Sequence, residues 1–489
     1  MAGLPGTSIT RRSQPTVPGV PTDTGQTFVV GFAEKGAANT ATRIDDLTAY
    51  ETIFGESLSG VATTAHSAVE LLFGEGAGTV YFSRVVGPTP VVATVTLEDA
   101  GTADVLRIDA VSPGAWGNDL SVDVDVDGTD FTLTIYLDDV QVEQFADLAD
   151  NAAAVAALAT SDYVRAVQLG ANDPAATGSA QDLTSGTDDN GNATDTEWAA
   201  ALAAFDIELG PGQVIAPGRT TATAHAQLLA HAKDNNRTAL LDAANGASKS
   251  TLIAQGATTA ALTDARYGGT FATWVNIGQR VAGVDRPVPG SVFAAGVIAR
   301  SDQVNDAGVW PIGDKGAGRA MPGNGMAAYA TSATSEFSAA DREDLTNAGI
   351  NLTLDDASGL RLYGFRSAST DEAWSNLGHQ RLFMSIQAQA ERIAEGFVGE
   401  RITADTVSRW HQALEGMLYP LYTSGALFGG FTAPSWDQSF RVVTAAPVNT
   451  DATAEARELN AELYIRMSES AELVAVIATK VPVTSPVAA

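Results

Sequence analysis

The chain has 489 residues, 45% of them hydrophobic, which predicts a folded protein of two to four domains and excludes wholesale disorder. No apolar run reaches about 18 residues and cysteine is absent, so we expect no membrane-spanning helix, disulfide or thiolate metal site. The formal net charge of −30, from 58 acidic and 28 basic residues, argues against nucleic acid as a direct partner. The first ten residues lack the pattern of a secretory signal, so we expect assembly in a cytoplasm.

Both ends of the chain have the composition of extended segments. Residues 1–26 are rich in Pro, Gly, Ser and Thr and show no helical periodicity, so we interpret them as an N-terminal arm that is mobile or docked on something else. Residues 481–489 carry two prolines and predict a short C-terminal tail.

Residues 27–94 alternate between strand and helix patterns. Short apolar runs predict strands, whereas apolar residues at helical spacing that stop at glycines predict helices. This alternation is typical of an α/β domain. The predicted strands cover 27–32 and 79–86, and the predicted helices cover 44–54 and 65–73.

Residues 95–190 differ sharply from this pattern. They hold 19 Asp and Glu against two Arg, so −17 of the net charge lies in this segment. On either side of Gly128, apolar residues alternate with polar ones from 120 to 126 and from 131 to 137, which predicts a β-hairpin with an acidic outer face. We interpret the segment as an acidic, β-rich outer domain inserted into the α/β domain.

One stretch of this hairpin also resembles the opening of a calcium-binding loop. Asp123, Asp125 and Asp127 are followed by Gly128, as in D-x-D-x-D-G. Such a loop needs a bidentate acid at its twelfth position, where this chain has Thr134. The intervening valines favour a strand, so we prefer the hairpin and expect no metal.

The α/β pattern resumes after the acidic segment, and a third region follows it. Residues 191–345 complete the α/β domain, with strands predicted at 213–216 and 238–242 and helices at 221–234 and 291–300. Residues 346–480 predict a C-terminal domain with two long amphipathic helices. Its predicted elements are a strand at 360–365, helices around 382–397 and 404–424, of which Pro420 kinks or ends the second, and strands at 459–467 and 471–480.

Catalytic motifs are missing from the sequence. The five histidines form no metal-binding spacing, and no nucleophile elbow, P-loop or dinucleotide fingerprint is present. We therefore expect no enzymatic activity and no cofactor.

Five stretches, in order along most of the chain, resemble the contractile phage tail sheath family. The most specific lies at 114–120 and reads Gly-x-Trp-Gly-Asn-x-Leu. The stretches are 27–36 with 43–47 and 54–55, 68–76 with 80–85, 112–120, 345–351 with 361–366, and 424–429.

The resemblance implies an α+β multidomain fold. It consists of an α/β middle domain, the inserted acidic domain, and an α/β C-terminal domain whose antiparallel strands are shared between subunits. The resemblance further implies a virion protein, assembled in the host cytoplasm, whose subunits stack as hexameric rings around an inner tail tube. The sleeve contracts from a metastable extended state and drives the tube through the host envelope. The implied partners are further copies of the chain, the tube protein, and baseplate and tail terminator proteins.

Strand exchange between subunits is the first site that the resemblance implies. The N-terminal arm near 6–12 and the apolar strand at 471–480 would each add a strand to a neighbour. Alternatively, 471–480 completes the sheet of its own subunit. The candidate residues are Ser8, Ile9, Thr10, Leu473, Val474, Val476 and Ile477.

A weak, reversible contact with the tube is the second implied site. Its candidates are four arginines of the C-terminal region, which could equally pair with glutamates 391, 395, 400 or 415 on their own helices. The candidates are Arg381, Arg392, Arg401 and Arg409.

Three other interpretations stay open. The same fold could serve a bacterial contractile injection system or a tailocin. An acidic surface-layer or adhesive protein would need a signal peptide. A hydrolase could use Asp242 or Asp302 near strand ends, but no motif supplies its nucleophile and base.

Overall fold

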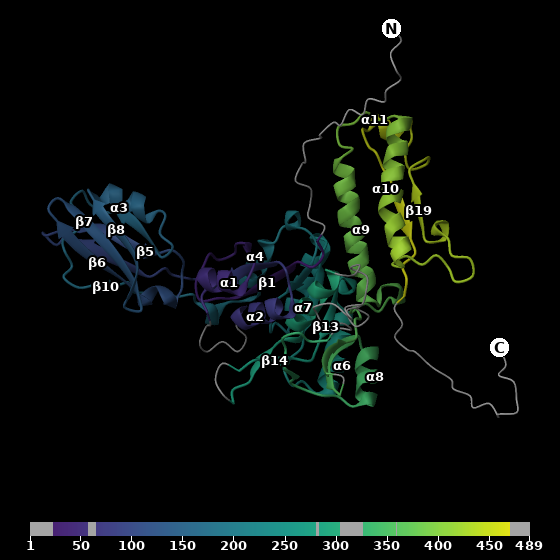
Figure 1. Cartoon of the computed structure of the whole chain (residues 1–489), viewed down its shortest axis with the longest axis horizontal. Helices are drawn as coiled ribbons and strands as arrows, with labels where there is room; N and C mark the ends of the chain where they lie inside the picture. Colours follow the sequence, from purple (N-terminus) through teal and green to yellow (C-terminus); the bar gives the residue numbers. More distant parts are fainter. Residues whose placement is uncertain (1–22, 57–64, 280–282, 304–325, 358, 470–489) are drawn as a thin grey trace, which may run out of the picture. The chain divides into compact units, whose positions relative to one another are not determined.

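The computed structural model describes residues 23–56, 65–279, 283–303, 326–357 and 359–469 (Figure 1). The chain forms two compact units, Met1–Glu395 and Gly396–Ala489. Helices and five β-sheets occur among the described residues, which confirms the predicted mixed α+β class. None of the described helices is both long and apolar enough to cross a membrane.

An eight-stranded sheet is the centre of the first unit, in the order β18-β17-β13-β12-β11-β1-β3-β2. The six strands from β17 to β3 are parallel, and antiparallel β18 and β2 form the edges. The strand order reverses between β1 and β11. The strands are β1 Thr27–Phe32, β2 Thr42–Ile44, β3 Val80–Val85, β11 Gln213–Ile215, β12 Thr238–Asp242, β13 Gly268–Phe271, β17 Ile350–Asp356 and β18 Gly359–Tyr363.

Helices cover both faces of this sheet, so its central strands are apolar on both sides. Val29 packs in the core with α2 and α7, whereas Phe28 and Val30 pack with α4 and α5. Every residue of α7 from Gly290 to Ser301 is buried. The helices are α1 Leu47–Phe54, α2 Ala65–Glu75, α4 Asp195–Ala203, α5 Ala222–Asp234, α6 Lys249–Ala260, α7 Gly290–Asp302, α8 Ala339–Asn347 and α9 Leu377–Glu395.

The boundary between the two units differs from the predicted start of a C-terminal domain at 346. Strand β17 pairs with β13, with Thr270 opposite Ile350 and Phe271 opposite Asn351. Strands β17 and β18 therefore belong to the central sheet, and α9 also belongs to the first unit. An apolar strand pattern shows that a strand forms but does not identify the neighbour it pairs with.

The acidic segment folds around a core of its own, drawn in blue in Figure 1. Its two sheets have the orders β10-β6-β7-β8 and β4-β5-β9. Strands β6 and β7 are the predicted hairpin, and no cluster of three candidate metal ligands forms among the residues the structure describes. The elements are β4 Thr94–Glu98, β5 Asp104–Ala110, β6 Leu120–Asp127, β7 Asp130–Leu137, β8 Val140–Leu148, α3 Asn151–Leu158, β9 Val164–Gln168 and β10 Gln181–Asp182.

The chain enters and leaves this outer domain through two segments that lie side by side. Val91 and Thr94 form antiparallel bridges with Thr187 and Thr184, respectively. The Gly87 N–H donates to the carbonyl of residue 188 at 2.8 Å. The two crossings therefore form a short, paired stem.

A buried arginine holds the base of this stem. Arg84 of β3 is wholly buried, and its guanidinium donates to backbone carbonyls at 2.8–3.0 Å on two separate loops. Burial lowers the pKa of Arg84 to about 10, so the side chain stays charged at neutral pH. The accepting carbonyls belong to Ala33, Glu34, Gly36 and Pro113.

The Gly-x-Trp-Gly-Asn-x-Leu stretch lies at the same junction. Gly114 has a φ of +142°, and a Cβ there would lie 2.8 Å from the Glu34 carbonyl oxygen. The Asn118 side chain exchanges two hydrogen bonds with the backbone of Gly186, at 2.8 and 3.0 Å. The stretch therefore joins the outer domain to the central one.

We predict that Gly114→Ala lowers the free energy of unfolding by about 2–4 kcal/mol, because it combines a forbidden φ with a backbone clash. Gly128→Ala is the matched control, since Gly128 also has a positive φ but no atom within 4 Å of its Cβ position. Gly128→Ala should lower the free energy of unfolding by about 1–2 kcal/mol. Urea unfolding measures both, and equal losses would contradict the close approach at the junction.

A second buried arginine lies behind α5. Arg237 donates to three backbone carbonyls and, at 2.9 Å, to Nε2 of His231. Burial and the neighbouring positive charge of Arg237 lower the pKa of His231 to about 3.

This site predicts acid sensitivity. Between about pH 3 and 6.5 the unfolded chain binds a proton at His231 that the folded chain excludes, so the free energy of unfolding rises with pH in this window. The slope is about 1.4 kcal/mol per pH unit. His231→Gln should therefore lose about 2 kcal/mol less than the parent chain between pH 7 and pH 5 in urea unfolding. Parallel pH profiles would contradict the assignment.

Three further strands form a small sheet in the first unit, and the second unit has its own elements. The small sheet has the order β15-β14-β16. The bounds are β14 Val275–Ile277, β15 Arg286–Val288, β16 Ser332–Ala333, α10 Ala404–Ser424, β19 Phe440–Val443, α11 Asp451–Glu455 and β20 Glu462–Ile465.

Candidate assembly surface

The second unit is built on one long helix and a two-stranded ribbon. Helix α10 has the predicted bounds, although it continues through Pro420 and ends only at Ser424, before Gly425 in the left-handed conformation. Its buried face includes Trp410, Leu414 and Leu418. These residues recur at helical spacing, which is why the sequence pattern located the helix correctly.

The ribbon consists of antiparallel β19 and β20, in which Phe440 pairs with Ile465 and Val442 with Leu463. Phe440 and Val442 are buried, and β19 packs against α10. On the opposite face, Tyr464 is 57% exposed. The ribbon is therefore amphipathic, with one face in the core and one face outside.

Both edges of the ribbon are open along β19 and β20 in the described part of the second unit, residues 396–469. Just beyond β20, Met467 forms a single bridge with Leu427. A two-stranded ribbon is marginally stable by itself, and its edges carry unpaired N–H and C=O groups that can accept another strand. This ribbon is the candidate assembly surface.

The predicted strand donors lie outside the described residues. The structure therefore does not distinguish donation to a neighbour from pairing within the subunit. The donors are Ser8, Ile9, Thr10, Leu473, Val474, Val476 and Ile477.

Arg381 does not fit the predicted tube contact. Its side chain is wholly buried, pairs with Asp302 and donates to Gln213 Oε1 at 3.0 Å. The prediction placed it on a surface because arginines are usually exposed, and a sequence pattern does not show a buried acidic partner on another helix.

The other three arginines are exposed. Arg409 pairs with Glu400, one of the four glutamates of the local-pairing alternative, although Glu400 precedes α10, and at 3.1 Å with Asp405, which that alternative did not name. Arg392 and Arg401 form no ion pair with any residue that the structure describes. They stay candidates for a contact outside the subunit.

The two environments predict different costs of substitution. Arg381→Met should lower the free energy of unfolding by about 3–5 kcal/mol, because it leaves a buried carboxylate without its cation. Arg409→Ala should leave the urea unfolding curve unchanged within error, because exposed ion pairs contribute little. A small loss for Arg381→Met would contradict its burial.

Sequence analysis missed a group of exposed apolar side chains in the second unit. Phe431 is 91% and Val398 is 82% exposed, and Trp436 is also exposed. Phe431 stacks edge-on against Phe428, with 4.9 Å between ring centroids. The aromatic residues between Gly425 and Phe440, in a loop with two adjacent glycines and one proline, were the available signal, since exposed aromatic residues mark contact surfaces.

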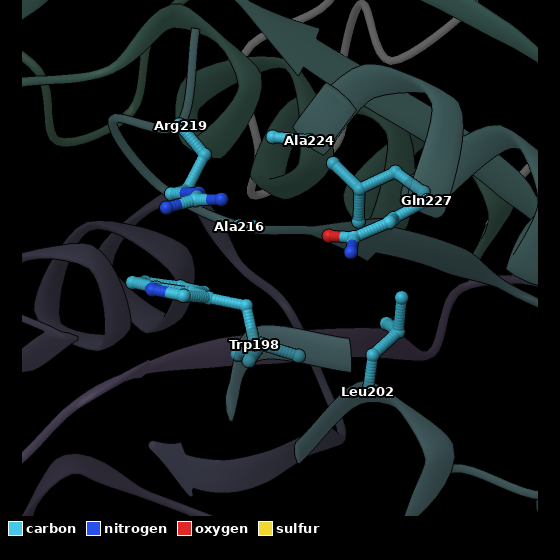
Figure 2. Close-up of a pocket in the computed structure, with 8 residues that line it drawn as sticks. Trp198, Leu202, Ala216, Arg219, Ala224 and Gln227 are labelled. Atoms are coloured by element: carbon cyan, nitrogen blue, oxygen red, sulfur yellow. The ribbon is translucent and has the colours of Figure 1, made fainter. Parts of the chain in front are cut away.

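A small cavity lies in the first unit where the strand order reverses, between β1 and β11. Such points hold ligands in many α/β proteins. Here the Arg219 guanidinium lies over the Trp198 ring, 4.7 Å from its centroid (Figure 2). The same guanidinium pairs with Asp195. The cavity has a volume of about 10 Å³, room for one water molecule and not for a metabolite.

The two aspartates of the hydrolase alternative are buried. Asp242 accepts the N–H groups of Gly218 at 2.9 Å and Ser291 at 3.0 Å, and burial raises its pKa to about 7. Asp302 pairs with Arg381. These contacts fix the backbone and favour a structural role over catalysis.

Comparison with known proteins gives matches in structure only. No family model and no curated protein sequence matches the chain. A sheath tail protein from Desulfitobacterium hafniense is 17% identical, with a TM-score of 0.59 over 90% of this chain and 93% of that chain. A sheath tail protein from Listeria innocua is 18% identical, with a TM-score of 0.58 over 85% and 88%.

The sheath of an extracellular contractile injection system in its contracted state is 13% identical, with a TM-score of 0.55 over 98% of both chains. These TM-scores, over most of each chain, show a shared fold. The predicted resemblance to the contractile tail sheath family is thus confirmed at the level of the fold, since these neighbours are sheath proteins.

Proposed function

We propose that this chain is the structural subunit of a contractile sheath. Its copies stack as hexameric rings around an inner tube and contract from a metastable extended state. The observation that carries the proposal is the fold match to sheath proteins over nine-tenths or more of both chains. The five ordered sequence stretches support it independently.

Strand addition is the proposed means of assembly. Among the described residues, the β19–β20 ribbon has no further strand at either edge, and the chain has two segments with strand-like or extended sequence, near 6–12 and 471–480. Two donated strands would close both edges and satisfy their backbone groups. Such a contact is head-to-tail, so it extends into a filament instead of closing on itself.

Contraction requires that each subunit moves without unfolding. The central sheet is covered on both faces, which suits a body that shifts between two packings while the donated strands stay attached. A difference of a few kcal/mol per subunit, of the size expected between two such packings, sums over many subunits. The acidic outer domain would face solvent, and Arg392 and Arg401 would contact the tube weakly.

The particle that this sheath serves has two candidates. Neighbours include sheath tail proteins and the sheath of an extracellular injection system, so the fold fits a phage tail and an injection system equally well. Tube, baseplate and terminator proteins are the proposed partners in both cases, and passage of the tube through a cell envelope is the proposed outcome.

Proline substitutions test strand donation by the arm. Neighbouring residues of a strand point their N–H groups to opposite sides, so either Ser8→Pro or Ile9→Pro must remove a ladder hydrogen bond. We expect the full chain to form hollow sleeves in negative-stain electron microscopy, and at least one proline variant to stay monomeric. Ser8→Val and Ile9→Val are the matched controls and should assemble. Sleeves from both proline variants would contradict donation by the arm.

The same design at the other end separates donation from pairing within the subunit. Val476→Pro and Ile477→Pro should prevent sleeves and leave monomer stability unchanged if 471–480 pairs with a neighbour. If the segment instead completes its own ribbon, one of these variants lowers the monomer's free energy of unfolding. A full chain that stays monomeric at high concentration would contradict the sheath proposal itself.

A further inference from the structure

The three residues that precede the first strand are buried. Asp23 is exposed, but Thr24 and Gln26 are less than a tenth exposed, and β1 starts only at Thr27. We call residues 23–26 the arm root, because the N-terminal arm continues from them. Apart from Asp23, the root is buried in the first unit and does not lie on its surface.

A buried polar network holds the arm root. Thr24 Oγ1 donates to Asp302 Oδ2 at 2.6 Å, and Arg381 pairs with the same carboxylate. Arg381 also donates to the Thr24 carbonyl at 3.2 Å and to Gln213 Oε1 at 3.0 Å. Gln213 Nε2 in turn donates to Thr27 Oγ1 at 3.0 Å.

Four separate segments of the chain meet in this network. Asp302 ends α7, Arg381 lies in α9, and Gln213 begins β11 beside the arm root. Arg381 and Gln213 are wholly buried and Asp302 almost so. These side chains are shielded from bulk solvent, so their charge-assisted hydrogen bonds are strong and removal of one partner is costly.

The position of the network matters when the arm is pulled. Tension would otherwise act first on the hydrogen bonds at the start of β1, such as Thr27 N–H to the carbonyl of residue 79 at 3.1 Å. Such bonds are individually weak and can break one after another. The network holds the chain upstream of them, at Thr24.

We infer that Arg381 and Asp302 anchor the arm root, so that tension on the N-terminal arm passes into α7 and α9 and does not peel β1 from the sheet. Arg381 is thus a positioning residue for the arm. The tension itself rests on the proposed function, in which a neighbouring subunit holds the arm; the anchor rests on the contacts alone.

Native-state amide hydrogen exchange on the full-length monomer tests the anchor. Arg381→Met removes the cation, and Arg300→Met is the matched control. Arg300 is also wholly buried and pairs with buried Glu75 at 2.8 Å, and its guanidinium donates to Glu75 and the Met326 carbonyl instead of to the root. Exchange at Gln26 and Thr27 is compared with exchange in β12, so that a change in global stability cancels.

Arg381→Met should speed exchange at the root at least about a hundredfold relative to β12, because it breaks a buried ion pair. Arg300→Met should leave this ratio unchanged and instead speed exchange at residues 328–330, whose N–H groups donate to the Glu75 carboxylate at 2.8–2.9 Å. Equal ratios at the root in both variants would overturn the anchor.

A pulling experiment tests the mechanical claim. The chain has no cysteine, so Ala2→Cys and Ala244→Cys supply the only thiols for attachment of handles. In single-molecule force spectroscopy, Arg381→Met should lower the force of the first extension event, and Arg300→Met should not. An unchanged first force would overturn the inference. Neither measurement needs sleeves, so failure of the anchor and failure of the sheath proposal are distinguishable.

Discussion

A buried guanidinium is the constraint on which the first unit depends. Its charge is costly to bury unless acceptors surround most of its donors, and that charge persists at neutral pH. The four largest wholly buried side chains of the described residues are Arg84, Arg237, Arg300 and Arg381. Each has to bring carbonyls or carboxylates from distant segments to one place. Hydrophobic packing stabilises the cores without specifying geometry. The hydrogen bonds of these arginines, in contrast, require particular segments to lie next to one another.

The four arginines differ in what they join. Arg84 connects the central domain to the base of the outer domain through carbonyls alone. Arg300 connects α7 to α2 through Glu75, and Arg381 connects α7 and α9 to the arm root. The chain has no cysteine and therefore no disulfide. Charge-assisted hydrogen bonds of these arginines connect its distant segments instead.

Local periodicity made several elements predictable. β1, the hairpin of β6 and β7, and α10 follow the sequence patterns closely, because alternation and helical spacing reflect which side of an element is buried. Pairing partners were not predictable in this way. The assignment of β17 to the central sheet and the burial of Arg381 depend on residues more than 70 positions away, which no local pattern records.

The candidate surface was predictable only in part. Sequence composition identified two extended ends, whereas the open edges of the ribbon and the exposure of Phe431 require three-dimensional packing. The strand edges of the acidic domain differ from those of the ribbon in charge. That domain carries acidic residues that discourage pairing with another sheet, whereas the exposed face of the ribbon carries one charge of each sign, Arg441 and Glu462, beside Tyr464.

The paired stem of the outer domain has an evolutionary consequence. Because Gly87 and residue 188 are hydrogen-bonded neighbours, everything between them leaves and returns at one point of the central domain. Segments with adjacent ends can be lengthened, shortened or replaced without changing the path of the surrounding chain. Replacement of the acidic domain would thus change the charge that the molecule presents at this point without altering the connections of the central sheet.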